Sequence, residues 1–543
     1  MNAHMHRFLT LTLLLGLASS CTMVRDFLIP PARNAYAGMN RVKQRPADLI
    51  LGRVEVPGVG LRSLAIRGST LVAVGMPTEM TALMGSRTSR VDMNGLWVSP
   101  GLRDAHVHLE GAALVQSAPA LFNAKTPQAL SELFESHLGL VPVRGWLWGF
   151  GLQKRLTKSL SAESLETMMP GVPLWLSAAD GHSAVLSATL VDRLPPKLRK
   201  QVNALHGRVS EQLARRAWFT LAPPAGERLK PYVVKVLKRW RRLGITSVDV
   251  MGARMELYDT LRELEVAGRL TLEVRLYLAW PSPKVQRWLQ AQAHKPLRLR
   301  SPKLSPSSRR HKVTIVGVKT WLDGTLGSHT AALSKAYSDR PQELKPLVGA
   351  ARLSAIRSFT DRLSLQLAVH AIGDAAVDAV IGLKPGAAGR PIRVEHVQVA
   401  RPDQLPQLQH VLCSIQPRHR LEDSPWARER LGVERMSWAY RGASLAKTCP
   451  LLFGSDAPVS TSDPRQIIDA AVKRPSPERL TRAQALTAMQ RDPLNAKFSP
   501  RLHIGSTANL TFWNVDPKKN DSAKPMASMV HGILSINRSK SAK

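Results

Sequence analysis

Cysteine is scarce in this sequence of 543 residues, which contains only Cys21, Cys413 and Cys449. With Cys21 set aside in an N-terminal signal, the remaining two cannot build a zinc-finger cage, and they indicate no disulfide framework. Both lie near the starts of apolar runs, in HVLCSIQP and KTCPLLFG. We therefore expect Cys413 and Cys449 to be buried thiols of the hydrophobic core.

Acidic residues are also few. The 40 Asp and Glu stand against 76 Lys and Arg, so the formal net charge is +36. Such a charge suits a nucleic acid, an anionic lipid or an acidic polymer, or is simply the basic surface of a protein from an Arg- and Lys-rich proteome. The densest stretch, 282–312, has nine basic and no acidic residues, and its prolines predict an exposed loop. Because aromatic residues do not alternate with this charge, we expect no specific nucleic-acid binding.

The apolar run at the N-terminus, 8–18, has eleven residues and is too short to span a bilayer. It ends in small residues directly before Cys21, which resembles a bacterial lipoprotein signal. We predict a signal peptide over 1–21, lipidation of Cys21 and a tether over 22–46, with an ordinary secretory signal as the alternative. A lipid anchor would hold the protein on a membrane of the cell envelope, facing the periplasm. Thr22 in place of Asp favours the outer membrane over the inner one.

The two ends of the remaining chain share a β-rich pattern. Short runs of β-forming residues separated by turn residues occupy 47–100, and a similar pattern returns over 499–538. We expect one small β-sandwich built from both ends. Between them, 101–498 repeats an apolar run, a polar residue at its end, a loop and a helix-like segment. This alternation predicts an α/β fold with a parallel sheet, of the (β/α)8 TIM-barrel type.

The spacing of the polar residues indicates an insertion. His370 and His396 are 26 residues apart, about one strand-helix unit, whereas His108 and Lys319 are 211 apart. Three such units would take roughly 100 residues. We therefore expect an inserted α/β segment after the first barrel strand, at about 115–230.

Histidines at the ends of predicted strands suggest a metal site. In the run DAHVH, His106 and His108 occupy alternate positions of a strand and therefore face the same side. Neutral imidazoles that converge suit zinc or a related divalent ion. His370 and His396 end later strands, and Asp456 ends the run LLFGSDAPV. Each alone is more often structural, but together they favour a metal centre with Asp456 as its proton acceptor.

The sequence does not place two further polar residues, Glu395 and Lys319, as directly. Glu395 has the opposite strand parity to His396, so we expect it to face the helix layer. Lys319 is a donor only and cannot ligate a metal as an ammonium group. It either points elsewhere and pairs with Asp323, or is carbamylated by carbon dioxide into an anionic bridging ligand.

Six runs in order carry a family resemblance: GLRDAHVHLEG, VKTWLDGTLGSHTAAL, HAIGDAAV, VEHVQV, QPRHRLEDSPWARERLG and FGSDAPV. Together they resemble the amidohydrolase superfamily, and in particular the branch that contains N-substituted formamide deformylase, over about 47–538. The resemblance implies the barrel, one or two divalent metals and Lys319 as a carbamylated bridge. It implies six metal residues, with Asp456 also the catalytic acid/base: His106, His108, Lys319, His370, His396 and Asp456.

The same resemblance points to the substrate pocket. His182, His419 and Asp423 match family positions near the substrate. The chain departs from the family where it has Leu152-Gln153 in place of an aromatic-acidic pair, and His329 in place of an arginine. Because both departures should line the pocket, an unusual substrate is expected.

The expected activity is hydrolysis of a non-peptide C–N bond, in an amide or N-acyl group of a small molecule, by metal-activated water with zinc as the expected metal. A deaminase or an ester or lactone hydrolase on the same scaffold is an alternative, because a fold does not fix a substrate. A non-catalytic basic lipoprotein of the cell surface is another. The sequence leaves the oligomeric state open.

Overall fold

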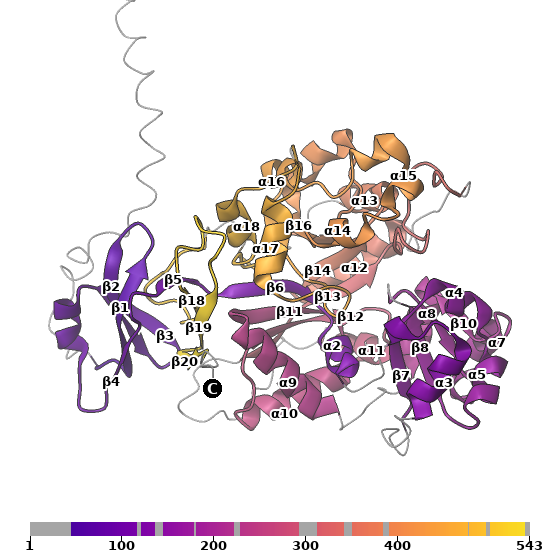
Figure 1. Ribbon diagram of the computed structural model, residues 1–543, viewed down its shortest axis with the longest axis horizontal. Helices are drawn as coiled ribbons and strands as arrows, with labels where there is room; N and C mark the ends of the chain where they lie inside the picture. The colour runs from indigo at the N-terminus through magenta and orange to yellow at the C-terminus, as the bar shows by residue number, and fades with distance from the viewer. Residues whose placement is uncertain are drawn as a thin grey trace, which may run out of the picture.

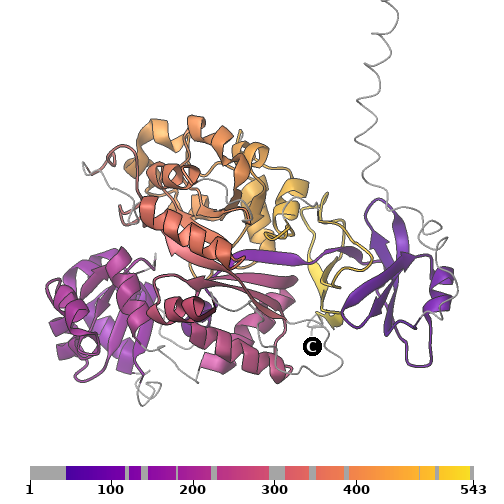
Figure 2. The same cartoon turned by 180° about the vertical axis from the view of Figure 1, so that it is seen from behind.

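The computed structural model describes residues 45–116, 121–135, 145–178, 181–221, 229–292, 312–340, 350–383, 390–475, 477–495 and 500–537. The predicted signal peptide, the lipidation site Cys21 and all but the end of the tether lie outside these residues. Over the described ranges, no helix combines the length and the apolar character needed to cross a membrane. A barrel occupies the centre, with a sheet from both chain ends on one side and an inserted lobe on the other (Figures 1 and 2).

Eight parallel strands make the central sheet, in the order β17-β16-β15-β14-β13-β12-β11-β6. Their side chains are almost all buried, as expected for strands covered by helices. The predicted α/β barrel is thereby confirmed. The strands are β6 (Leu102–Val107), β11 (Ile245–Ala253), β12 (Glu273–Ala279), β13 (Val313–Trp321), β14 (Gln366–Ala371), β15 (Arg393–His396), β16 (Leu412–Ile415) and β17 (Leu451–Phe453).

The two ends of this sheet meet just beyond β17. Val107 and Ala457 form a parallel bridge, and the Asp456 N–H donates to the His106 carbonyl at 2.7 Å. Gly454 allows this approach, because a Cβ there would lie 2.5 Å from the His106 nitrogen. The closure therefore brings Asp456 next to His106 although 350 positions separate them in sequence.

Helices surround the barrel and cover its outer face (Figures 1 and 2). One of them, α11, occupies part of the basic stretch 282–312, so the expectation of a loop there is wrong for 283–292; residues 293–311 lie outside the described part. The helix is amphipathic, because Val285 and Leu289 are buried against the core while the basic residues face outward. A dense run of basic residues therefore does not exclude a helix. The helices include α2 (Leu109–Val115), α9 (Leu229–Arg242), α10 (Met255–Val266), α11 (Pro283–Gln292), α12 (Ala350–Arg362), α13 (Asp374–Ile381), α14 (His419–Asp423), α15 (Ala427–Met436), α16 (Ala443–Thr448), α17 (Pro464–Val472), α18 (Arg482–Ala488) and the 3-10 helix η6 (Pro402–His410).

The second sheet joins both ends of the chain, as the β-rich patterns predict. Strand β18 pairs with β5 in antiparallel register, and β5 in turn pairs with β1. That the sheet closes into a sandwich stays a prediction. Its strands are β1 (Leu49–Val56), β2 (Gly60–Arg67), β3 (Thr70–Gly75), β4 (Ser89–Asp92), β5 (Trp97–Pro100), β18 (Leu510–Trp513), β19 (Pro525–Val530) and β20 (Ile533–Ile536).

The lobe between β6 and β11 has its own four-stranded sheet, in the order β10-β9-β8-β7. It lies beside the barrel in both views (Figures 1 and 2). Its strands are β7 (Leu147–Leu152), β8 (Leu174–Ala178), β9 (Ser183–Leu186) and β10 (Arg208–Ser210), and its helices are α3 (Pro127–Glu135), α4 (Lys154–Ser159), α5 (Ala162–Met168), α6 (Ala188–Val191), α7 (Pro196–Asn203) and α8 (Glu211–Thr220).

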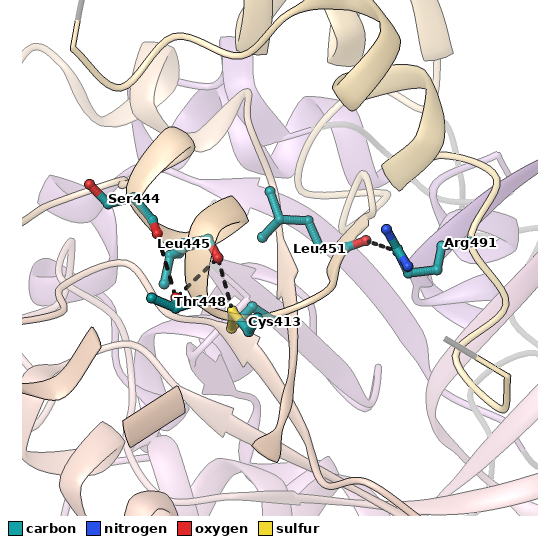
Figure 3. Close-up of a disulfide and its surroundings, with 7 residues drawn as sticks. Cys413, Ser444, Leu445, Thr448, Leu451 and Arg491 are labelled. Atoms are coloured by element: carbon teal, nitrogen blue, oxygen red, sulfur yellow. Dashed lines mark hydrogen bonds between the residues drawn. A yellow bond between two sulfur atoms is a disulfide. The ribbon is translucent and has the colours of Figure 1, made fainter. Parts of the chain in front are cut away.

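Cys413 and Cys449 form a disulfide, so the expectation of two free thiols is wrong (Figure 3). Cys413 lies in β16, and Cys449 follows α16 directly before β17. The two are 36 residues apart in sequence, but β16 pairs with β17 and brings their Cα atoms to 6.0 Å. The pairing depends on strand neighbours, which cysteine spacing cannot reveal.

Candidate metal centre

The structure brings all six predicted metal residues to one cavity of about 200 Å³, which we call the inner chamber. Each comes from the carboxyl end of a barrel strand or the loop that follows it, where such barrels place their chemistry. The residues are His106 in β6, His108 before α2, Lys319 in β13, His370 in β14, His396 in β15 and Asp456 after β17.

His106, His108 and Asp456 form the tightest group. The Oδ1 atom of Asp456 lies 3.4 Å from His106 Nε2 and 3.0 Å from His108 Nε2. The other ring nitrogen of each histidine is a donor, because His106 Nδ1–H donates to Glu395 at 2.7 Å and His108 Nδ1–H to the Met251 carbonyl at 3.0 Å. These bonds fix the tautomers, so both Nε2 lone pairs point toward the same carboxylate.

His370 and His396 form a second pair, with ring centroids 4.4 Å apart. The His396 ring is also 4.9 Å from that of His106, so the two groups adjoin. His396 Nδ1–H donates to Gln416 at 2.8 Å, and His370 Nε2–H donates to the Gly324 carbonyl at 3.0 Å. A proton on one nitrogen of each ring leaves the lone pair of the other nitrogen for a metal.

Lys319 is fully buried in the inner chamber, and its Nζ makes no hydrogen bond to any described residue. It does not pair with Asp323, whose carboxylate accepts backbone N–H groups of Ile372 and Gly373. Burial lowers the pKa of Lys319 to about 8. The side chain therefore holds a neutral amine in an appreciable fraction of molecules near neutral pH.

Glu395 faces the barrel interior, so its expected position on the helix side is wrong. It is fully buried between His106 and Arg393. The strand alternation is broken because His396 has φ +79°, so the backbone leaves the extended conformation at this residue. Consecutive side chains can then both point inward.

The predicted substrate residues line a wider outer chamber of about 1190 Å³, which shares His370, His396 and Asp456 with the inner one. His419 is the nearest of them to the metal residues, with Nε2 3.7 Å from Asp456 Oδ2. The others are His182, bonded to Glu211 at 3.0 Å, His329, bonded to Asp339 at 2.9 Å, and Asp423, which accepts from Tyr440 at 2.7 Å. Leu152 and Gln153 also line this chamber.

Burial keeps His106, His370 and His396 neutral. Burial lowers the pKa of His106 to about 4, and it lowers the pKa values of His370 and His396 well below their usual range. Burial opposes ionisation of Asp456, but His106 and His108 outweigh it and hold the pKa of Asp456 well below its ordinary value. At neutral pH, His106, His370 and His396 are therefore neutral and Asp456 is a carboxylate, and these are the protonation states that bind a metal.

The residues present fit a divalent metal. His106 Nε2 and Asp456 Oδ1 are both fully buried, and neither has a hydrogen-bond partner among the described residues. Unpaired buried polar atoms are costly in a folded protein, and a cation between them would satisfy both. Two overlapping groups have donors within 4.8 Å of one another, namely His106, His108 and Asp456, and His396, His419 and Asp456.

The barrel and the donor set at its strand ends, taken with the comparisons below, define a metal-dependent hydrolase. The chain belongs to the amidohydrolase family, whose model matches residues 90–532. The predicted superfamily is thereby confirmed.

The chain is also similar to individual known proteins. The chain is 28% identical over 484 residues to protein LONG AFTER FAR-RED 3 of Arabidopsis thaliana, covering 82% of this chain and 81% of that protein. It is 25% identical over 158 residues to N-substituted formamide deformylase of Arthrobacter pascens, covering 27% of this chain and 29% of that protein. An uncharacterized metal-dependent hydrolase from Pyrococcus furiosus superposes with a TM-score of 0.69 at 26% identity, covering 87% of this chain and all of that one.

Three polar residues orient the histidines in a way that the sequence did not predict: Glu395 on His106, Gln416 on His396 and Gln398 on His419. Glu395 and Gln398 flank His396 in the run VEHVQV, and Gln416 opens QPRHR. Polar residues at or just beyond apolar strands were the available signal. Their partners lie on other strands, so the pairs themselves are visible only in the fold.

Proposed function

We propose that this hydrolase cleaves a non-peptide C–N bond, in an amide or N-acyl group of a small molecule, with zinc as its metal. The observation that carries the proposal is the convergence of His106 and His108 on Asp456, whose Oδ1 atom lies 3.4 and 3.0 Å from their Nε2 atoms. Imidazole nitrogens and a carboxylate oxygen are the donors that catalytic zinc takes. When bound, the metal supplies an acidified water and a polarised carbonyl.

Asp456 is the proposed acid/base. Its pKa lies well below the ordinary range, so it is ionised and able to accept a proton at neutral pH. It takes the proton of the attacking water and passes that proton to the departing nitrogen. His419, 3.7 Å from its Oδ2 atom, is placed to orient the carboxylate from the outer chamber.

Lys319 is proposed to be carbamylated. Its neutral amine nitrogen forms a bond to the carbon of carbon dioxide and releases one proton to solvent. The product carries one negative charge on two oxygens, which removes the repulsion between a buried cation and a metal. The absence of a hydrogen-bond partner for Nζ among the described residues and the lowered pKa support this modification.

Metal analysis and one variant test the proposal. Elemental analysis of protein purified without chelator should find one or two equivalents of divalent metal, mainly zinc. Asp456→Asn should fold and retain metal but lose at least about a hundredfold in kcat, the usual size of a general acid/base contribution. Asp403→Asn, an exposed carboxylate in η6, is the matched control and should behave as wild type. Turnover by Asp456→Asn near the wild-type rate would contradict the assigned role.

A substrate panel separates the alternatives. Small N-acyl and N-formyl compounds, esters, lactones and exocyclic amines on heterocycles should be compared at equal concentration. We expect the amides to have the highest kcat/KM. Faster turnover of an ester, a lactone or a heterocyclic amine would replace the C–N proposal by the corresponding chemistry on the same scaffold.

We also propose lipid anchoring at Cys21 on the periplasmic face of a bacterial membrane. The signal-like run before Cys21 supports it, and so does the pairing of Cys413 with Cys449, because disulfides persist mainly outside the cytosol. The full chain expressed in a bacterium should sediment with outer membranes, whereas Cys21→Ala should be released. Equal release of both proteins would refute the anchor.

A further inference from the structure

Aromatic side chains form one wall of the inner chamber. We call this group the aromatic wall. It combines the inserted lobe, which contributes strands β7 and β8 and helix α8, with the end of barrel strand β13. Its members are Trp148, Phe150, Trp175, Trp218, Phe219 and Trp321.

Two indole N–H groups of the aromatic wall have hydrogen-bond partners within the protein. The indole N–H groups of Trp148 and Trp175 both donate to the Ser177 hydroxyl at 2.9 Å. Trp148 and Trp175 are buried, and each packs against Trp218 with ring centroids 6.2 and 5.2 Å apart. With these donors satisfied inside the protein, the wall presents carbon surface, and an apolar group is the ligand that gains most from it.

Side-chain cations already lie over three rings of the aromatic wall. The Arg254 guanidinium lies 5.1 Å from the Trp218 ring and 5.3 Å from the Phe219 ring. The Arg215 guanidinium lies 5.5 Å from the centroid of the Trp321 ring. These cations occupy the electron-rich faces that would attract a positively charged ligand. The wall therefore favours a neutral group over an ammonium group.

The size of the inner chamber restricts that group. Its volume is about 200 Å³, close to the roughly 150 Å³ of an apolar cavity that holds one benzene ring. The outer chamber is about six times larger, and the two share His182, His370, His396 and Asp456. If the scissile bond lies where the two chambers meet, the inner chamber can hold one ring and the outer chamber can hold a longer substituent.

We propose that the substrate carries a neutral, single-ring aromatic group on one side of the scissile bond and that this ring occupies the aromatic wall. This inference rests on the proposed function for the nature of that bond. The aromatic wall thus selects the class of substrate, while the metal residues perform the chemistry.

Binding of molecules without a hydrolysable bond tests the wall directly. The probes are benzyl alcohol, ethanol, 2-naphthalenemethanol and benzylammonium, titrated into the metal-loaded enzyme and followed by tryptophan fluorescence. Benzyl alcohol should bind at least tenfold more tightly than ethanol, and more tightly than the larger naphthyl and the charged ammonium probes. Equal affinity of benzyl alcohol and ethanol, or tighter binding of benzylammonium, would overturn the inference.

Variants locate the bound ring. Trp218→Leu and Trp321→Leu, on separate elements, should each raise the Kd of benzyl alcohol at least fivefold. The matched control is Trp288→Leu, which truncates a half-buried tryptophan of α11 outside both chambers and should leave that Kd unchanged. Circular dichroism confirms folding of each variant. If neither wall variant changes the Kd, the ring binds elsewhere and the inference fails.

Turnover separates this inference from the proposed function. N-methylacetamide is compared with N-methyl-2-phenylacetamide and N-benzylacetamide, which place the ring on the acyl side and on the amine side. One ring-bearing amide should exceed N-methylacetamide at least tenfold in kcat/KM. Equal turnover of all three amides would support the proposed amide hydrolysis but overturn the inference of an aromatic substrate group. No turnover, with selective binding of benzyl alcohol retained, would overturn the amide chemistry and keep the aromatic wall.

Discussion

Replacement of Glu395 by glutamine should weaken metal binding although Glu395 is not itself a proposed ligand. In the wild type its carboxylate accepts the His106 Nδ1 proton at 2.7 Å, with no exposure of either side chain. A glutamine amide keeps the shape but loses the charge, and its NH2 group can face Nδ1. His106 would then carry its proton on Nε2, the atom that faces Asp456, and that proton blocks coordination.

The magnitude follows from the geometry. Loss of a hydrogen bond that orients a metal-binding histidine typically costs about 10- to 100-fold in metal affinity, equivalent to about 1.4 to 2.7 kcal/mol. Glu395→Gln also leaves Arg393 with one carboxylate fewer, although Asp249 still accepts from it at 2.6 Å. Breaking a buried ion pair costs up to about 3 to 5 kcal/mol of folding stability, so metal affinity and stability must be measured separately.

Glu273→Gln is the matched control. Glu273 is also nearly buried and pairs with Arg275 at 3.0 Å, but it lies in β12, away from the metal residues. Both variants should unfold at lower denaturant concentration than the wild type. Only Glu395→Gln should release zinc to a competing chelator at a 10- to 100-fold lower chelator concentration. Wild-type zinc affinity in a folded Glu395→Gln protein would refute the orienting role.

Three further predictions concern other parts of the molecule. Lys319→Met should lower the metal content by one equivalent in elemental analysis, and intact mass should show one bound carbon dioxide only in the wild type; an unchanged metal count would exclude a bridging role. Replacing Cys413 and Cys449 by serine should lower the free energy of unfolding in urea by up to about 4 kcal/mol for a loop closed across 36 residues, while zinc content stays unchanged. Burial opposes ionisation of Glu211, but His182 outweighs it and lowers the pKa of Glu211 from 4.5 to about 2, so its ionised form contributes about 3 kcal/mol that is complete above pH 5 and lost as the pH falls toward 2. The free energy of unfolding of Glu211→Gln, measured in urea, should therefore change less with pH over that interval than that of the wild type. An equal change with pH in both proteins would contradict the stabilising role of ionised Glu211.

The barrel and most of its metal residues are predictable because their signals are local. A parallel barrel strand is apolar almost throughout, so a polar residue at its end stands out, as His370 and Asp456 do. Alternation along a strand places His106 and His108 on one side without knowledge of any neighbour. The order of the strands along the chain then brings their carboxyl ends to the same edge.

The misplaced residues depend on backbone detail and strand neighbours. Parity predicts an outward Glu395, but the positive φ of His396 breaks the alternation within one residue. Cys413 and Cys449 have no pairing signal in their spacing, since β16 and β17 must first lie side by side. The outward charges of α11 similarly concealed the buried Val285 and Leu289.

The sequence by itself determined the alternation of strands and helices, the edge of the barrel at which the polar residues gather, and the chemical kind of metal donor. These follow from covalent neighbours and from the period of burial along each element. Only the tertiary structure decided which atoms face one another, which carboxylate orients His106, and that the inserted lobe closes the inner chamber with aromatic rings. Those relations join segments far apart in the chain, and they are fixed by packing between elements, for which a linear pattern carries no distance.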